Sequence, residues 1–354
     1  MWRLYVFLKD EDNMVKVRDD ILKTEDGIID VEASVERMLE DRKDLDKDAL
    51  VKALQFSLTH GANVMTPYHE SCFRRGLVIA EVLKSLEPDT ETLIAGLLLP
   101  AVAFEACTLD EVKANFNKVV VLLIQGVIHV EHTQGKVLHQ GKNRAFPFVA
   151  DSTDNLRRML LAVIEDIRVV LIKLAERVAA LRACSKLEAT IAIDIAREAQ
   201  EIYAPLANRL GIGQIKWEIE DLSFRILEPA AYKQIAKALD EKRLDRESYI
   251  KAVIEKIQTA LKKEGIEAEV KGRVKHIYSI WRKMQKKQLE FSELYDVRAV
   301  RIIVPQIRDC YAALGVVHAL WQHIHKEFDD YIATPKENGY QSLHTAVIGP
   351  EGKT

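Results

Sequence analysis

A strongly basic segment interrupts a sequence whose charges are otherwise balanced. Residues 271–287, KGRVKHIYSIWRKMQKK, include seven Lys or Arg and no acidic residue, whereas the whole chain has a formal net charge of -3. Phosphate groups require local positive charge of this kind. In a helix that starts near Lys275, Ser279 and Lys283 would share a polar face and Ile280 would face the core. The segment is therefore predicted to pack with one face and to bind anions with the other.

Other residues close to this segment also suit a nucleotide. Arg273 can stack on a base or bind phosphate through its planar guanidinium. Asp296 opens a predicted strand, where a carboxylate could hold Mg²⁺ while the ion bridges phosphates. A third cluster combines an aromatic ring that can stack on a purine with cationic and amide side chains: Lys336, Asn338, Tyr340, Gln341 and His344.

Each feature alone also has a simpler interpretation. The basic segment could be a solvated helix or a nucleic-acid surface, Asp296 could cap a strand, and the third cluster could be a polar hairpin with a packed Tyr. The presence of a basic helix and a carboxylate in succession favours phosphate chemistry over these alternatives.

The elements that would position these residues follow from the apolar periodicity. Helical spacing runs from about residue 31 to 130, with Pro100 among the expected breaks, and the polar segment 132–148 is predicted to be an exposed loop. A long helix is predicted for 151–183 and more helix for 198–227. Strands then alternate with helices: strands at 267–272, 297–304 and 344–349, and helices at 246–265 and 309–324.

Length and composition fit two domains of an α+β protein. A chain of 354 residues exceeds the roughly 250–300 residues that one core serves, and 48% apolar with 30% charged residues is ordinary for a soluble globular protein. We expect an all-helical domain at 1–195, including the 151–183 helix, and a mixed-sheet domain at 196–354.

Targeting and redox signals point to a cytoplasmic protein. The apolar N-terminus is soon followed by acidic residues, and no run approaches the ~20 apolar residues of a membrane helix, so neither a secretory signal nor a membrane partner is expected. The four cysteines form no CxxC pair and are expected to be reduced, packed thiols: Cys72, Cys107, Cys184 and Cys310.

Three segments, in this order and spacing, resemble the synthetase motifs of the RelA/SpoT family: GRVKHIYSIWRKM, YDVRAVRIIV and YIATPKENGYQSLHT. The resemblance extends back through IYAPLANRLGIGQIKWEIEDLSFRIL and KLAERVAALR and covers nearly the whole chain. Members of this family transfer pyrophosphate from ATP to the 3′-hydroxyl of GTP or GDP and so make the stringent-response alarmone (p)ppGpp. The resemblance implies a nucleotidyltransferase-like mixed-sheet synthetase domain after an all-helical HD-type domain.

The resemblance assigns roles to the candidate residues of the synthetase domain. Arg273 would stack on the ATP adenine, Asp296 would be the catalytic Mg²⁺ ligand, and Tyr340 would stack on the guanine. Phosphates would be held by Lys275, Ser279 and Lys283, and the acceptor nucleotide would be surrounded by Lys336, Asn338, Gln341 and His344. The acidic stretch 327–330 resembles the branch of the family that only synthesises the alarmone, but no physical role follows for it from the sequence.

The same resemblance implies that the helical domain is a pseudo-hydrolase. Relatives that degrade the alarmone carry a His, a His-Asp pair and a distal Asp around Mn²⁺. This sequence has Arg75 for the first His, Leu99-Pro100 for the pair, Glu176 for the distal Asp and Ala180 where the family has Asn. A scaffold is therefore expected. A rearranged metal site would have to use other histidines, without a matching carboxylate motif: His60, His69, His129, His132 and His139.

Two rival functions and two expectations about the chain ends accompany this interpretation. The rivals are a module that docks on RNA or the ribosome without catalysis and an HD phosphohydrolase, which Leu99 and Pro100 disfavour.

In the family, the ribosome and uncharged tRNA are sensed by further C-terminal domains, and a second carboxylate follows the region that ends at Thr354. An incomplete synthetase domain with impaired transfer and an exposed edge near 344–349 is thus expected. Met14 resembles the usual family start, so residues 1–13 are expected to pack poorly.

Overall fold

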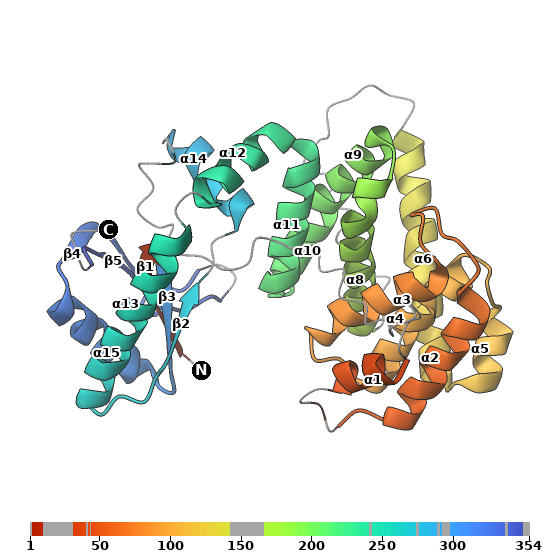
Figure 1. Ribbon diagram of the computed structural model, residues 1–354, viewed down its shortest axis with the longest axis horizontal. Helices are drawn as coiled ribbons and strands as arrows, with labels where there is room; N and C mark the ends of the chain where they lie inside the picture. Colours follow the sequence, from red (N-terminus) through yellow and green to blue (C-terminus); the bar gives the residue numbers. More distant parts are fainter. Residues whose placement is uncertain are drawn as a thin grey trace. The chain divides into compact units, whose positions relative to one another are not determined.

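The structure is a computed structural model that describes these residues: 2–9, 31–39, 42, 44–141, 166–240, 243–273, 276–288, 291, 298–336 and 339–349. The chain divides into two compact units (Figure 1). Unit 1 comprises Met1–Lys16 and Glu228–Thr354, and unit 2 comprises Val17–Leu227. This division differs from the expected boundary between 195 and 196, because the helices up to Leu227 pack within unit 2 and the N-terminal strand pairs within unit 1.

Unit 2 is built from helices, as expected for the N-terminal half. The helices are α1 (Val31–Leu39), α2 (Lys47–Gly61), α3 (Cys72–Lys84), α4 (Thr90–Ala103), α5 (Leu109–Asn115), α6 (Lys118–Gly141), α8 (Ile167–Ala183), α9 (Ala189–Glu198), α10 (Ala204–Arg209) and α11 (Gly213–Leu227). A 3-10 turn (Cys184–Lys186) follows α8, and a π-helical turn (Ala199–Tyr203) joins α9 to α10.

Helices α4 and α8 form the centre of unit 2. Every side chain of α4 from Thr92 to Ala101 is buried, and α8 is buried on most of its faces. Because such helices must be covered on all sides, α4 packs on α2, α3, α6 and α8, while α8 also packs on α3 and α11. Even so, within the described residues none of the helices combines the length and apolar character needed to cross a membrane.

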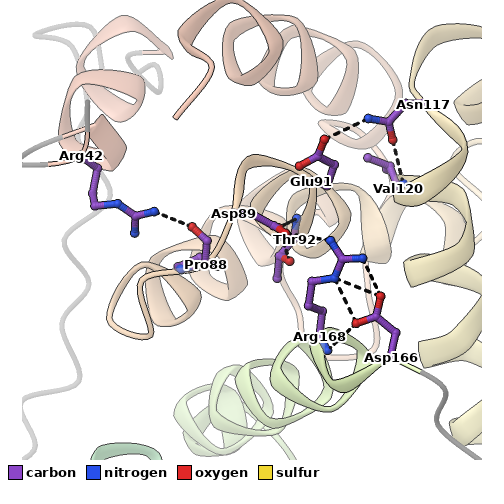
Figure 2. Close-up of polar contacts among 9 residues, drawn as sticks. All are labelled: Arg42, Pro88, Asp89, Glu91, Thr92, Asn117, Val120, Asp166 and Arg168. Carbon is purple, nitrogen blue, oxygen red and sulfur yellow. Dashed lines mark hydrogen bonds and ion pairs between the residues drawn. The ribbon is translucent and has the colours of Figure 1, made fainter. Parts of the chain in front are cut away.

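A polar network ties the N-terminal ends of α4 and α8 together (Figure 2). Asp89 caps α4 by accepting hydrogen bonds from the Thr92 amide at 2.8 Å and the Thr92 hydroxyl at 2.5 Å, and it pairs with Arg168 at 2.7 Å. Arg168 also forms a forked ion pair with Asp166, the N-cap of α8. Burial opposes ionisation of Asp89, but Thr92 and Arg168 outweigh it and hold its pKa below the usual value.

Two predictions about the middle of the chain need correction or lie partly outside the described residues. The expected loop at 132–148 begins as helix, because α6 continues to Gly141. The expected helix at 151–183 is described only from Ile167 onwards, as α8. The remaining residues of both segments are outside the described part of the chain.

Unit 1 combines a five-stranded mixed sheet with helices, which confirms the α+β prediction. The strands are β1 (Trp2–Lys9), β2 (Glu269–Arg273), β3 (Arg298–Val304), β4 (His323–Asp330) and β5 (Leu343–Val347), in the spatial order β2-β3-β1-β5-β4. β1 and β5 run parallel, and the other neighbouring pairs run antiparallel. The helices are α12 (Pro229–Asp240), α13 (Arg243–Lys263), α14 (Ile277–Lys287) and α15 (Ile307–Leu320). The three predicted strands correspond to β2, β3 and β5, whereas β1 and β4 were not predicted.

Helices α13 and α15 cover one face of this sheet (Figure 1). Successive side chains of a strand point to opposite faces. On β3, accordingly, Val300, Ile302 and Val304 are buried in the core, whereas Arg301 and Ile303 between them are half-buried. Apolar residues of the two helices complete this core: Tyr249, Ile250, Val253, Ile257, Leu261, Cys310, Ala313, Val317 and Trp321.

Strand β1 lies in the middle of the sheet. Leu4 is in register with Ile302 of β3 on one side and with Leu343 of β5 on the other. The expectation that residues 1–13 pack poorly therefore fails for the backbone of Trp2–Lys9, a segment rich in the aromatic and aliphatic residues that suit strands. The expectation of an exposed edge at β5 is wrong as well, because β1 and β4 flank β5.

All four cysteines are buried, as predicted. Burial raises the pKa of the Cys107, Cys184 and Cys310 thiols to about 11 and also raises that of Cys72. Thiols held neutral in this way are packing residues, since the thiolate is the reactive form.

Replacing Asp89 with Ala should lower the free energy of unfolding of unit 2 by about 1–2 kcal/mol, because α4 loses its N-cap. The change can be measured by urea unfolding followed by circular dichroism. Asp44→Ala is the control, since it removes only an exposed ion pair with Arg42 and should cost less than about 1 kcal/mol. Equal losses in the two variants would contradict the capping role.

Candidate functional site

The basic segment of unit 1 forms the end of β2 and the helix α14. The strand ends at Arg273, and α14 begins at Ile277. Ile277 and Ile280 are buried, whereas Ser279 and Lys283 are half-buried. The predicted division of this helix into a packed face and a polar face is confirmed at these positions.

The strand register pairs the end of β2 with the start of β3. The backbone of Arg273, the last residue of β2, is in register with Ala299, close to the start of β3 at Arg298. Asp296 precedes that start by two residues in the sequence. Lys275, Asp296 and the side chain of Arg273 lie outside the described residues, so their predicted roles stay predictions.

Four side chains gather where β4 ends and β5 begins; we call Tyr331, Lys336, Tyr340 and His344 the aromatic–cation cluster. The Tyr340 hydroxyl and His344 Nε2 share a hydrogen bond of 3.0 Å. The Tyr331 ring lies edge to face with His344, at 5.2 Å between ring centres, and with Tyr340, at 6.3 Å. Lys336 Nζ lies 4.2 Å from the centre of the Tyr331 ring. Such a group offers aromatic surface to a base and a positive charge to a phosphate.

Backbone hydrogen bonds of the β4–β5 connection hold this cluster. The Tyr331 amide donates to the Ser342 carbonyl at 2.9 Å, the Lys336 amide to the Tyr340 carbonyl at 3.2 Å, and the Gly339 amide to the Lys336 carbonyl at 2.8 Å. Gly339 has a φ of +74°. This left-handed conformation is readily adopted by glycine, which explains the Asn-Gly pair at this point of the sequence.

The sequence identified three members of the cluster and missed Tyr331. In the sequence, Tyr331 is marked only by its position as an aromatic residue directly after the acidic stretch 327–330. Burial raises the pKa of the Tyr331 hydroxyl, and the negative charge of Asp329 raises it further. Gln341 is half-buried beside the cluster, and Asn338 lies outside the described residues.

In unit 2, the positions aligned with hydrolase ligands meet at one pocket. The pocket has a volume of about 320 Å³. The charged residues Arg75 and Glu176 line it, and most of the other lining residues, Leu99 and Pro100 among them, are apolar. Ala180 is buried one helical turn beyond Glu176 on α8. Four of the positions that the sequence alignment singled out thus line the same pocket, and their assignment as degenerate hydrolase positions stays a prediction.

Glu176 is the centre of a buried group of ion pairs. Its carboxylate contacts Arg75 at 2.9 Å, Lys173 at 3.1 Å and Arg177 at 3.2 Å. Arg75, which is 1% exposed, also pairs with Glu70 at 3.1 Å and stacks on the Tyr68 ring. Burial alone would raise the pKa of Glu176, but Lys173, Arg177 and Arg75 together hold it well below its usual range. The guanidinium of Arg75 thus supplies positive charge between two carboxylates.

The remaining hydrolase positions are apolar and packed. Leu99 and Pro100 are both buried in α4. Pro100 was expected to end its helix, but α4 continues to Ala103. Because proline has no backbone N–H, α4 lacks one hydrogen bond near its C-terminal end. The burial of neighbouring side chains offsets the free-energy cost of this lost bond. The described residues contain no group of three or more His, Cys, Asp or Glu that could hold a metal ion.

The histidines of unit 2 lie on different elements of the chain. His60 Nδ1 lies 2.9 Å from the Phe56 carbonyl, and its ring stacks on Phe56. His69 occupies an exposed turn with a φ of 56°. The other three lie along α6, where only the side chain of His129 is among the described residues: His129, His132 and His139.

Comparisons with known proteins match both units. Residues 53–213 match the family model of the HD domain, and residues 272–354 match that of the region found in RelA / SpoT proteins. A GTP pyrophosphokinase of Photobacterium angustum is 53% identical over 281 residues, which are 79% of this chain and 37% of the relative. GTP pyrophosphokinases of Escherichia coli and Streptomyces coelicolor are 51% and 41% identical, over 37% and 31% of their lengths. The chain therefore spans about a third of the length of these relatives.

The low pKa of Glu176 makes the stability of unit 2 depend on pH. A carboxylate whose pKa is depressed by folding stabilises the fold above its unfolded value of about 4.3, and this contribution is lost as the pH falls toward the folded value. Glu176→Gln should therefore be less stable than the wild type at pH 7, and the difference should narrow below about pH 4. Urea unfolding at several pH values measures this. Glu188→Gln, an exposed control, should leave the profile unchanged, and a constant difference for Glu176→Gln would contradict the assignment.

Proposed function

The chain belongs to the RelA/SpoT family, and we propose that its unit 1 transfers pyrophosphate from ATP to the 3′-hydroxyl of GTP or GDP, which makes (p)ppGpp. The aromatic–cation cluster is the observation that supports this most directly. It lies within the matched region 272–354, and its rings, imidazole and ammonium suit a purine nucleotide. In this proposal Tyr340 stacks on the guanine of the acceptor.

The other acceptor contacts follow from the same cluster. Lys336 and His344 would contact the phosphates or ribose of the acceptor, because both carry polar groups beside the Tyr340 ring. Asn338 and Gln341 would hydrogen-bond the nucleotide through their amides.

On the donor side, we assign the ATP adenine to Arg273 and the ATP phosphates to Lys275, Ser279 and Lys283. The half-buried polar face of α14 supports the last two assignments. The acceptor 3′-oxygen would form a bond to the β-phosphorus of ATP while the bond from that phosphorus to the α–β bridging oxygen breaks, so that AMP leaves and the hydroxyl proton is released. Such transfer depends on positioning and charge neutralisation, which are what cationic side chains on a rigid helix provide.

Asp296 is the proposed Mg²⁺ ligand. Mg²⁺ takes one or two protein carboxylates and completes its shell with water and phosphate oxygens, so one carboxylate before β3, together with the substrate phosphates, fits this donor set. When bound, the ion neutralises charge on the transferred phosphates. In the sequence, this carboxylate precedes β3 by two residues, and the start of β3 pairs with the end of β2.

Unit 2 is proposed to be a scaffold without hydrolase activity. Arg75 and Glu176 form an ion pair in its pocket, and Leu99 and Pro100 carry no group that binds a metal ion. We further propose a cytoplasmic location, and association with the ribosome and uncharged tRNA through the parts of the relatives that this chain does not span. These last proposals rest on the family alone.

The decisive experiment incubates the chain, and a chain extended at its C-terminus, with ATP, Mg²⁺ and labelled GDP or GTP. A product two phosphates richer is expected from the extended chain. In that chain Asp296→Asn should abolish transfer while nucleotide binding persists, because the isostere removes the charge that holds Mg²⁺. Full turnover by Asp296→Asn would refute the metal assignment.

Salt-sensitive RNA binding without any pyrophosphate transfer would instead support a docking module. Incubation with ppGpp and Mn²⁺ should release no pyrophosphate.

Tyr340→Ala should weaken guanine-nucleotide binding by about 1–3 kcal/mol, the range of one base-stacking side chain. Tyr340→Phe is the matched control, because it keeps the ring and loses only the hydrogen bond with His344; it should retain most of the affinity. Titration with a fluorescent guanine nucleotide measures both variants. If Tyr340→Phe lost as much affinity as Tyr340→Ala, the hydroxyl rather than stacking would account for the contribution of Tyr340.

A further inference from the structure

The carboxylate of Asp330 joins the β4–β5 connection to helix α15. Its Oδ1 accepts hydrogen bonds from the amides of Ile332 at 3.0 Å and Ala333 at 2.8 Å. Its Oδ2 accepts a hydrogen bond from the Tyr311 hydroxyl of α15 at 3.0 Å. One side chain thus closes the turn that follows β4 and attaches this turn to a helix.

The alternation of side chains along β4 explains how the contact between Asp330 and α15 affects the aromatic–cation cluster on the other face of the sheet. In the register of β4 with β5, Asp330 lies opposite Leu343 and Asp329 lies opposite His344. Leu343 is buried in the core that α15 covers, so Asp330 shares the helix-covered face. Asp329 and His344 belong to the opposite face, where the charge of Asp329 raises the pKa of the Tyr331 hydroxyl.

Helix α15 holds this part of the sheet at two points. Besides the Tyr311–Asp330 bond, His318 Nε2 and the Thr345 hydroxyl share a hydrogen bond of 2.9 Å. Tyr311 and His318 are seven residues apart, so they lie on the same face of the helix. The helix itself is fixed by Cys310, Ala313 and Val317, all fully buried.

We propose that Asp330 is a positioning residue for the acceptor nucleotide. Through its three hydrogen bonds it sets the turn from which Tyr331 reaches Lys336, Tyr340 and His344, so that the cluster is assembled before the nucleotide binds. This gives one member of the acidic stretch 327–330 a physical role. The inference rests on the function proposed above, since it takes the cluster to be the acceptor site.

The test is equilibrium titration of the whole chain and its variants with a fluorescent GDP analogue and, separately, with ATP. Asp330→Ala should weaken guanine-nucleotide binding about tenfold and change ATP binding less than about twofold, because only the acceptor cluster loses its preorganisation. Asp330→Asn should stay within about threefold of the wild type, since the amide oxygen still accepts both backbone hydrogen bonds. Tyr311→Phe should lie between these two variants. Asp309→Ala, a neighbouring carboxylate at the start of α15, is the control and should behave as the wild type.

The outcomes separate the two proposals. Guanine-nucleotide binding by the wild type, with unchanged binding by Asp330→Ala, would overturn only the role of Asp330. Equal weakening of ATP and GDP binding, accompanied by a lower melting temperature, would show a structural role and overturn it too. A folded wild type that binds ATP but no guanine nucleotide would overturn the acceptor assignment of the cluster and the Asp330 inference with it.

Discussion

The compensation of charge around Glu176 is the constraint on which unit 2 depends. An isolated carboxylate in a helical core costs several kcal/mol, and Glu176 lies on α8, a helix buried on most of its faces. Arg75 reaches it from α3, while Lys173 and Arg177 reach it from α8 itself. Arg75 in turn requires Glu70, which lies just before α3. The close packing of α3 on α8 thus satisfies two buried carboxylates with one guanidinium. The capping network of Figure 2 joins α8 at its N-terminal end to the start of α4.

A different constraint organises unit 1. Its candidate site belongs to the connections between strands, and connections acquire a fixed shape only from the elements that hold them. The β4–β5 connection is held on the helix-covered face by the Tyr311–Asp330 and His318–Thr345 bonds and internally by the turn at Gly339. The cluster on the opposite face inherits this rigidity, which is what preorganisation of a nucleotide site requires.

The sequence predicted the helical half, three strands and the packed face of α14 because these depend on local periodicity. It missed β1, since nothing in the segment Trp2–Lys9 indicates that it pairs with β3 and β5, far away in the sequence. It also missed Tyr331, whose importance comes from a register that places Asp329 opposite His344. The resemblance singled out Leu99, Pro100 and Glu176, which line one pocket. It could not show that Arg75 pairs with Glu176, because that contact depends on how α3 packs on α8.

The charges around the unit 2 pocket form a balanced set. A carboxylate that is buried away from water stays ionised only where positive charge compensates it. Arg75 supplies such a charge to Glu176, and its second partner, Glu70, balances the guanidinium in turn. With Leu99 and Pro100 as apolar walls, no further charge in the pocket needs a counter-ion from solvent. Replacing Arg75 with His would therefore leave Glu176 without the guanidinium that contacts it, while Leu99 and Pro100 would still offer no group that binds a metal ion.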